Sequence, residues 1–469
     1  MDKLVNNLKE ALKAAGIKDG ATLSFHHHMR NGDYVLNMTL AAAAELGVKD
    51  LTVNASAIFP VHAPLIDLIK QGVVTSLECN YMSGPVGEAI SQGILDKPVI
   101  FRTHGGRPAD IASGQFPIDI AVIAAPAADK MGNISGKFGP SQCGSLGYAF
   151  ADAEFADQVI AVTDHLMPYP LVEYSIPETQ VNYVVQVDKI GDPKGIVSGT
   201  TKITRDPIGL LMAQYATQVI EASPYYQDGM SFQTGAGGAS LATAAFLKDR
   251  MLERGIKGSY GMGGITSYLV DMLEAGCFES LVDVQCFDLG AVESIRTNPK
   301  HREVSALHYA APRPAVASSL VDNLDFVILG ATEMDKNFNV NVHTNSQGVI
   351  MGGSGGHSDT AAGAKLAMII APLTRARMPL ILDQVTCLST PGETIDILVT
   401  QYGIAVNPRR EDLIQALSAS KLPLRSIEDL QKTAEDLVGK PKPLPHGDKV
   451  VGQVRYRTGE IISEIYQLN

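Results

Sequence analysis

The chain has 469 residues, of which 45% are hydrophobic and 19% are charged, so it is long enough to bury two or three cores unaided. This composition, with 44 glycines, excludes a disordered, collagenous or coiled-coil protein. The net charge of −12 is spread along the chain and would repel a phosphate backbone, so we expect no nucleic acid partner.

The first 170 residues alternate between short strands and helices. Leu4, Val5, Leu8 and Leu12 follow helical spacing and predict an N-terminal amphipathic helix rather than a signal peptide. Uncharged apolar runs predict strands buried on both faces, and the stretches between them predict helices. The strands are Leu51–Val53, Val99–Phe101, Ile118–Ala124 and Val159–Thr163, and two of the helices are Val35–Leu46 and Pro64–Gln71.

The chain also repeats itself at an offset near 205 residues. Residues 67–77 match 271–281, and residues 119–134 match 325–340 with a common Asp-Lys pair and a common Asn. Two shorter matches follow the same offset: Ser24-Phe25 with Ser231-Phe232, and Asp152 with Asp359. Four matches in order predict two homologous α/β domains, each a mainly parallel sheet with flanking helices, produced by internal duplication.

We place the first domain at residues 1–215 and the second at 216–469, because turn residues around 195–225 mark the join. Residues 440–469 form a C-terminal extension of the second domain. Within it, residues 440–445 read as an extended connector, and Val450–Tyr456 and Ile461–Tyr466 predict a hairpin around the Thr458-Gly459 turn.

No cofactor or metal motif is complete. The five cysteines lie far apart, which indicates neither a disulfide framework nor a zinc site and favours a reduced, cytoplasmic location (Cys79, Cys143, Cys277, Cys286 and Cys387). The glycine spacing of a Rossmann site is not met, no P-loop occurs, and Ser354 lacks the spacing of a nucleophile elbow. No apolar run is long enough to span a membrane.

Three polar or glycine-rich loops follow predicted strands: residues 24–33, 231–238 and 352–359. Loops of this kind let backbone N–H groups approach an anion, and a following helix N-terminus adds positive potential. In the last loop, Asp359 is also placed to cap a helix predicted over residues 360–370. Capping and a functional role are compatible.

The first loop contains His26, His27 and His28, followed by Arg30. His26 and His28 alone supply only two metal ligands, so capping of the strand end or carboxylate recognition with Arg30 are the alternatives to a metal site. A second basic cluster, Arg102, His104 and Arg107, follows the strand at Val99–Phe101. Arginine forks bind carboxylates bidentately, so the two clusters suit a polycarboxylate, unless Arg102 and Arg107 are solvated surface charges.

These residues resemble the coenzyme A transferase superfamily, in which two similar α/β domains bind a thioester at their junction. Residues 353–359 match its motif Gly-x-Gly-Gly-x-x-Asp, and residues 399–405 resemble its Thr-Glu-x-Gly-Val-Ala. Within the superfamily the chain is most similar to the citrate lyase α-subunit family along essentially its whole length, including residues 25–33 and 402–410. Many members use a glutamate nucleophile on the second strand of the second domain, where this chain has Gly263.

The resemblance implies an acyl-carrier transferase that converts citrate and an acetyl thioester into a citryl thioester and acetate. Without a glutamate, citrate itself would attack the thioester in a ternary complex. The implied thioester is on a phosphoribosyl-dephospho-coenzyme A group of a separate acyl carrier (γ) subunit, or on acetyl-CoA. No cofactor would be bound covalently to this chain, and Mg²⁺ is possible for the whole complex. A β subunit would then cleave the citryl thioester, and we expect a homo-oligomer within that complex.

The resemblance also assigns roles. We expect Arg30, Arg102, Arg107, His26, His28 and His104 to bind citrate. The catalytic set, with backbone amides that stabilise the oxyanion, comprises Gly237, Gly238, Gly355, Gly356 and His357. The thioester cofactor would contact Gly235, Gly352, Gly353, Ser354 and Asp359. The alternatives are a coenzyme A transferase or acyl-CoA hydrolase for a simpler carboxylate, and a scaffold subunit without catalysis.

Overall fold

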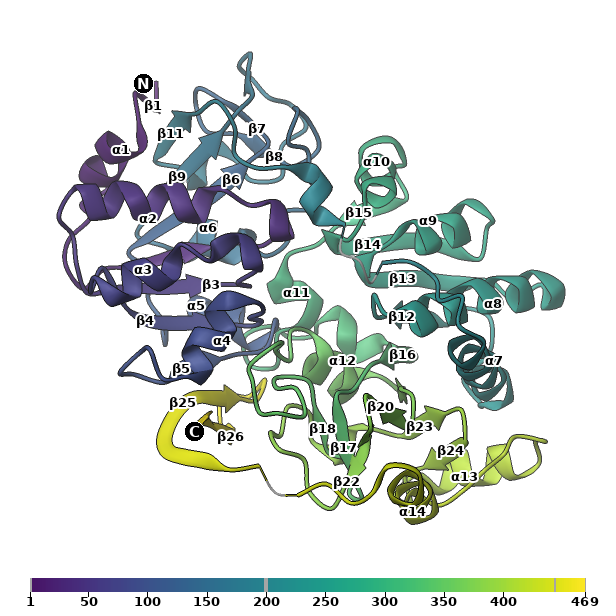
Figure 1. The fold of residues 1–469 in the computed structure, drawn as a ribbon. Coiled ribbons are helices and arrows are strands. Elements are labelled where there is room, and N and C mark those ends of the chain that lie inside the picture. Colours follow the sequence, from purple (N-terminus) through teal and green to yellow (C-terminus); the bar gives the residue numbers. More distant parts are fainter. Residues whose placement is uncertain (1, 198–200, 443, 469) are drawn as a thin grey trace.

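The computed structural model describes residues 2–197, 201–442 and 444–468, and it shows two α/β halves with a sheet in each (Figure 1). The first sheet has ten strands in the order β1 (Leu4–Val5), β11 (Tyr183–Gln186), β9 (Gln158–Thr163), β6 (Ile120–Ala125), β2 (Thr22–Phe25), β3 (Leu51–Ala55), β4 (Val74–Cys79), β5 (Val99–Phe101), β25 (His446–Arg455) and β26 (Ile461–Leu468). The second has eight, in the order β15 (His301–Glu303), β14 (Phe278–Cys286), β13 (Gly258–Ile265), β12 (Ser231–Thr234), β16 (Phe326–Leu329), β19 (Leu366–Ile370), β23 (Ile397–Thr400) and β24 (Gly403–Val406). Neighbouring strands are parallel except in the pairs β25–β26 and β23–β24.

The two sheets share one strand order, which confirms the prediction of two similar halves. The order β11-β9-β6-β2-β3-β4-β5 of the first sheet recurs as β23-β19-β16-β12-β13-β14-β15 in the second. The repeated Asp and Asn have one structural role, because Asp129 accepts a hydrogen bond from the Asn133 amide at 2.8 Å and Asp335 accepts one from Asn339 at 3.0 Å. Each half also contains a small three-stranded sheet of the same topology. In the first half it comprises β10 (Leu166–Met167), β7 (Ala127–Asp129) and β8 (Ile134–Ser135), and in the second half β18 (Val340–Asn341), β17 (Glu333–Asp335) and β22 (Ile381–Leu382). A separate two-stranded sheet pairs β20 (Thr374–Arg375) with β21 (Met378–Pro379).

Helices cover the sheets, and α11 and α12 lie between the halves (Figure 1). The α-helices are α1 (Leu8–Ala14), α2 (Val35–Glu45), α3 (Leu65–Lys70), α4 (Pro85–Ser91), α5 (Gly106–Ala112), α6 (Phe150–Phe155), α7 (Pro207–Ala222), α8 (Gly238–Arg254), α9 (Ser267–Glu274), α10 (Leu289–Thr297), α11 (Ala306–Ala310), α12 (His357–Gly363), α13 (Glu411–Ser418) and α14 (Ile427–Val438). The 3₁₀ helices are η1 (Arg30–Gly32), η2 (Pro60–His62), η3 (Glu178–Gln180), η4 (Pro193–Ile196), η5 (Leu320–Asn323) and η6 (Gly392–Thr394).

All four predicted strands occur within two residues of their predicted ends, as do both helices named from the first half. Two predicted helices are present but shorter than predicted. The N-terminal helix begins only at Leu8, where the Asn7 side chain accepts from the Glu10 N–H, and Leu4–Val5 instead form an edge strand beside β11. The helix predicted over 360–370 ends at Gly363, and Leu366–Ile370 are the buried strand β19, because an apolar run of five cannot be assigned to helix or strand by periodicity alone.

The predicted C-terminal hairpin is present, but it extends the sheet of the first half. β25 pairs in parallel with β5, with Gly452 opposite Val99 and Val454 opposite Phe101. The chain thus returns from the second half to the edge of the first sheet (Figure 1). A division at 215/216 would also cut α7, which packs on α8 of the second half. The structure therefore corrects the placement of residues 440–469 and of the first part of α7, while residues 198–200 of the predicted join and Pro443 of the connector lie outside the described residues.

Candidate active site at the junction

The glycine loop at 352–356 lies at the junction of the two halves. Its backbone bonds to the segments that follow β4 and β5 of the first sheet. The Met82 N–H donates to the Gly352 carbonyl at 3.0 Å, the Gly355 N–H donates to Asn80 at 3.2 Å, and the His104 N–H donates to Gly355 at 2.8 Å. The loop is therefore part of the contact between carboxyl-terminal strand ends, where α/β proteins bind ligands.

Asp359 joins the halves instead of capping its own helix. It is fully buried, and its carboxylate accepts from the Gly105 N–H at 2.8 Å and the Thr103 hydroxyl at 2.9 Å. The N-cap of α12 is Gly356, so the predicted capping role is wrong. Burial raises the pKa of Asp359 to about 6, against the opposing effect of Arg457 from the C-terminal hairpin, whose Nε lies 3.3 Å from Oδ1.

His357 is held by hydrogen bonds at both ring nitrogens. Its Nε2 donates to the Gly330 carbonyl at 2.9 Å, and its Nδ1 lies 2.8 Å from the Thr390 hydroxyl. Burial lowers the pKa of His357 to about 4, so the ring is neutral at pH 7. In this arrangement His357 positions the loop and has no ring nitrogen left for a substrate.

Close packing against neighbouring backbone explains two of the glycines in this loop. A Cβ on Gly352 would lie 2.2 Å from the Val342 carbonyl oxygen, and one on Gly353 would lie 2.2 Å from that of Asn80. Ser354 is buried, and its hydroxyl has no partner among the described residues. These positions bring two backbones together, and only the Ser354 hydroxyl remains as a side-chain group for a ligand.

The candidate oxyanion amides differ in availability. The N–H groups of Gly355 and Gly235 are already bonded, to Asn80 and to the Ile328 carbonyl. Those of Gly356, Gly237 and Gly238 have no acceptor among the described residues. Gly237 is the N-cap of the 17-residue helix α8, whose dipole makes this end attractive to negative charge.

Arg30 is a guanidinium without a carboxylate partner among residues 2–197, 201–442 and 444–468. It lies between rings of both halves, 5.6 Å from the Phe59 centroid and 4.4 Å from that of Phe287. Its φ of +52° places a non-glycine residue in the left-handed region, which costs about 1–2 kcal/mol and is typical of functional sites. A partly buried cation without a counter-ion is suited to an anionic ligand.

Arg102 and Arg107 are instead neutralised internally. The Arg102 Nε donates to Glu78 at 2.7 Å, and its Nη1 contacts Asp110. Arg107, 3% exposed, binds both carboxylate oxygens of Asp152. Neither is a solvated surface charge, and both have carboxylate partners that compete with a substrate.

The three histidines assigned to citrate are buried or partly buried and neutral. Burial lowers the pKa values of His26 and His104 to about 3, and it also lowers the pKa of His28, whose Nε2 donates to the Ala124 carbonyl at 2.8 Å. Both ring nitrogens of His26 lack a hydrogen-bond partner among the described residues. These rings can act as neutral donors or acceptors but supply no positive charge at pH 7.

Three further polar side chains at the junction were not singled out from the sequence. Tyr148 stacks on His27 with ring centroids 4.5 Å apart, and it lies tilted against His104 with centroids 4.4 Å apart. Tyr309 of α11 donates its hydroxyl to the Gln233 carboxamide at 3.0 Å. No motif marks them, although Gln233 aligns with His26 in the internal repeat, and that correspondence is the one signal available in the sequence.

Position 263 has no room for a side chain. Gly263 has a φ of +105°, and a Cβ there would lie 2.8 Å from the Gln233 Cδ. At Gly264 a Cβ would lie 2.3 Å from the Phe287 ring. The site therefore supplies no carboxylate from this strand, in agreement with the glycine in the sequence.

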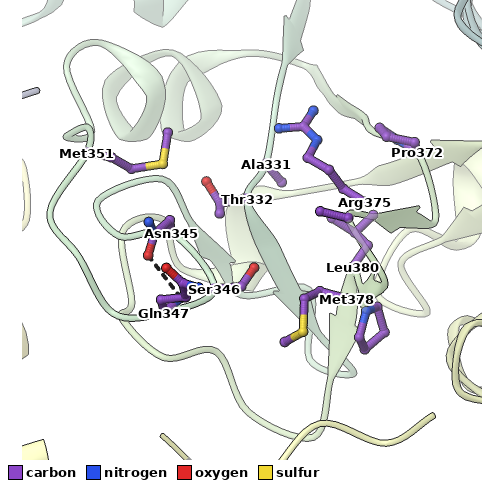
Figure 2. A pocket seen from close by; sticks show the side chains of 12 residues that line it. Ala331, Thr332, Asn345, Ser346, Gln347, Met351, Pro372, Arg375, Met378 and Leu380 are labelled. Carbon is purple, nitrogen blue, oxygen red and sulfur yellow. Dashed lines mark hydrogen bonds between the residues drawn. The ribbon is translucent and has the colours of Figure 1, made fainter. Parts of the chain in front are cut away.

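A cavity of about 260 Å³ lies in the second half (Figure 2). It opens beside the glycine loop, with Met351 on one wall and Thr332, two residues beyond the Gly330 partner of His357, on another. Arg375 enters from the hairpin β20–β21 and makes no ion pair with any described residue. The cavity lining combines apolar side chains with the polar side chains of Asn345, Ser346 and Gln347 and the exposed guanidinium of Arg375.

No described helix is both long and apolar enough to cross a membrane. In the described residues, no three His, Cys, Asp or Glu side chains are grouped so that they could hold a metal ion.

Comparison with known proteins agrees with the geometry. Residues 1–468 match the family described as citrate lyase, alpha subunit. The citrate lyase alpha chain of Haemophilus influenzae is 48% identical over 99% of this chain and 93% of its own length. A crystal structure of the citrate lyase alpha subunit of Streptococcus mutans in complex with citrate is 48% identical, with a TM-score of 0.98 over 100% of this chain and 92% of that one. A Pseudomonas malonate decarboxylase hetero-tetramer in complex with malonate shares the fold alone, at 18% identity and a TM-score of 0.68 over 94% of this chain and 84% of that one. The chain therefore belongs to the citrate lyase α-subunit family.

Proposed function

We propose that this chain, as the α subunit of a citrate lyase, transfers an acyl carrier from acetate to citrate in a direct exchange without a covalent enzyme intermediate. The observation that carries this mechanism is the unpaired Arg30 guanidinium at a junction where Gly263 and Gly264 exclude a carboxylate nucleophile. Citrate bound to the Streptococcus mutans relative supports the choice of substrate.

In this mechanism a citrate carboxylate oxygen attacks the carbonyl carbon of the acetyl thioester. The tetrahedral oxyanion collapses, the C–S bond breaks, and a mixed anhydride and a thiolate form. The thiolate then attacks the citryl carbonyl and acetate leaves, so no net proton is transferred. The free N–H groups of Gly356, Gly237 and Gly238 are candidates to stabilise the oxyanions.

Arg30 would bind one citrate carboxylate between Phe59 and Phe287. The two rings beside the guanidinium would limit the access of water and so strengthen the charge-assisted bond. The Tyr148 hydroxyl makes no hydrogen bond to the described residues and lies close enough to Arg30 to feel its charge. It is a second candidate donor to citrate. Arg102 and Arg107 have a positioning role through Glu78, Asp110 and Asp152.

The thioester would be on the phosphoribosyl-dephospho-coenzyme A group of an acyl carrier subunit, with acetyl-CoA as a substitute. Its arm would run from Gly356 past Gly330 and Thr332 into the cavity of Figure 2, towards Arg375. A β subunit would then cleave the citryl thioester. We also propose a cytoplasmic complex containing more than one copy of this chain.

The test is to incubate the purified chain with acetyl-carrier or acetyl-CoA and radiolabelled citrate. Label in a citryl thioester, with stoichiometric release of acetate, is the expected result. Acceptance of acetate or succinate in place of citrate would favour a general coenzyme A transferase, and net loss of the thioester without transfer would favour a hydrolase. No reaction in the presence of a competent β subunit and carrier would leave a scaffold role.

A further inference from the structure

Gln233 lies at the carboxyl end of β12, a central strand of the second sheet, and is 8% exposed. We propose that its side-chain amide donates a hydrogen bond to the citrate carboxylate that attacks the thioester. This inference rests on the proposed transferase function and adds a substrate-contacting residue to it.

The orientation of the amide is fixed by Tyr309. The Tyr309 hydroxyl, in a side chain only 2% exposed, donates to Oε1 of Gln233 at 3.0 Å. Because Oε1 accepts this bond, the two hydrogens on Nε2 point away from Tyr309, and Nε2 has no partner among the described residues. An N–H pair that has no protein acceptor among these residues and is not sealed from solvent can donate to a carboxylate oxygen of a bound ligand.

The space beside the amide is kept open by glycine. A Cβ on Gly263 would lie 2.8 Å from Cδ and 3.0 Å from Nε2 of Gln233. On the other side, the Cβ position of Gly356 is 3.3 Å from the Tyr309 hydroxyl oxygen. The Nε2 group of Gln233 and the N–H of Gly356 therefore both lie near Tyr309. In the proposed reaction the first would hold the attacking citrate carboxylate, and the second would stabilise the oxyanion of the thioester carbonyl.

The neutral charge of the amide fits the reaction. A carboxylate at this position would repel a trianionic substrate, and a cation would stabilise the attacking carboxylate in its ground state and so weaken it as a nucleophile. A single neutral donor orients the carboxylate and leaves a lone pair for the carbonyl carbon. Arg30, beyond Phe287 and Gly264, remains available for another carboxylate of the same citrate.

The test compares Gln233→Met, Gln233→Ala and Tyr309→Phe with Gln214→Ala, a control on the exposed face of α7. Initial rates of citryl thioester formation are measured against citrate and, separately, against acetyl thioester. Gln233→Met retains the length of the side chain, so it is expected to fold, and its kcat should fall about 10²–10³-fold, as for loss of one positioned donor. Tyr309→Phe should lose about tenfold, because the amide is then free to rotate, and neither variant should change the KM for the thioester more than threefold.

The result that overturns the proposal is a Gln233→Met enzyme with native unfolding behaviour and a kcat within threefold of wild type. A parallel rise in the KM for the thioester would also contradict it, because it would indicate a purely structural effect. Failure of the wild-type chain to form citryl thioester would instead refute the proposed function, so the two failures are distinguishable. Gln233→Ala gives the same comparison if the methionine variant does not fold.

Discussion

Asp359 of the second half accepts a hydrogen bond from the backbone N–H of Gly105 in the first half, at 2.8 Å. The approach requires glycine, because a Cβ at position 105 would lie 2.8 Å from Oδ1 of Asp359 and 2.1 Å from the Ala310 carbonyl oxygen. Arg457 of the C-terminal hairpin contacts the same carboxylate. One buried group therefore links both halves and the returning chain end, so its charge affects the stability of the whole assembly.

The ionisation of Asp359 should make part of the stability depend on pH. Its pKa in the folded state is about 6, above the unfolded value, so the folded state binds more protons between about pH 4 and 6. The contribution is complete below about pH 4 and is lost as the pH rises through 6. We expect the difference in free energy of unfolding, wild type minus Asp359→Asn, to fall by about 1–2 kcal/mol from pH 4.5 to 7 in urea titrations. A difference that rises with pH would mean that the pKa is depressed instead.

The buried histidines should act in the opposite direction. Burial lowers the pKa values of His26, His104 and His343 to about 3 and that of His357 to about 4. Their neutral forms stabilise the fold above about pH 6.5, and the unfolded state binds more protons below it, so stability falls with acidification. Four such groups outweigh one carboxylate, and we expect the wild-type free energy of unfolding to be lower at pH 5 than at pH 7.5. An equal or higher value at pH 5 would contradict these assignments.

The internal repeat predicted more of the fold than any local sequence pattern did. The offset near 205 fixed which strands correspond, and the two sheets have the same order because each repeat retains its own buried parallel strands. The edge partner of β5 could not be predicted, since its pairing with β25 joins residues 353 positions apart and depends on how the halves dock. The strand Leu366–Ile370 was predicted as helix, because a strand buried on both faces lacks the alternation of apolar and polar residues that distinguishes a strand from a helix.

The candidate site could be predicted where a glycine marks close contact between two parts of the chain, as at Gly353 and Gly355. It was not predictable where the role of a charge depends on a distant partner. Arg107 and Arg30 look alike in the sequence, yet Asp152 neutralises the first, and the second lies beside aromatic rings with no carboxylate partner among the described residues. Gln233 carries no motif at all, because an amide becomes a directed donor only through Tyr309, 76 positions along the chain.

The Arg107–Asp152 pair should have a structural role. Both side chains are buried, so Arg107→Met should lower the free energy of unfolding by about 3–5 kcal/mol by leaving an unpaired carboxylate. Adding Asp152→Leu should recover part of that loss, a coupling that a double-mutant cycle in urea measures directly. We expect the double variant to keep its KM for citrate within threefold. A rise comparable to that of Arg30 variants would return Arg107 to the substrate.

Two substitutions of Arg30 should affect citrate binding equally and protein stability differently. Loss of one charge-assisted contact is worth about 1.5–3 kcal/mol, so Arg30→Ala should raise the KM for citrate roughly 10–100-fold and leave the KM for the thioester unchanged. Arg30→Gly should lose citrate binding equally but unfold at a higher urea concentration than Arg30→Ala, because glycine accepts a φ of +52° without strain. Arg296→Ala, at an exposed site on α10, is the matched control. Unchanged citrate kinetics in Arg30→Gly would remove Arg30 from the site.

Finally, no side chain of this subunit should become acylated during turnover. Gly263 and Gly264 leave no space for a nucleophile, so borohydride or hydroxylamine added during steady-state exchange should trap no enzyme-bound thioester, as judged by intact mass. Gly263→Glu should not create one, because the left-handed φ and the Gln233 side chain prevent a side chain from fitting, and it should lower the free energy of unfolding by at least about 2 kcal/mol. A trapped adduct on the wild-type chain would show that the polypeptide, and not citrate, attacks the thioester first.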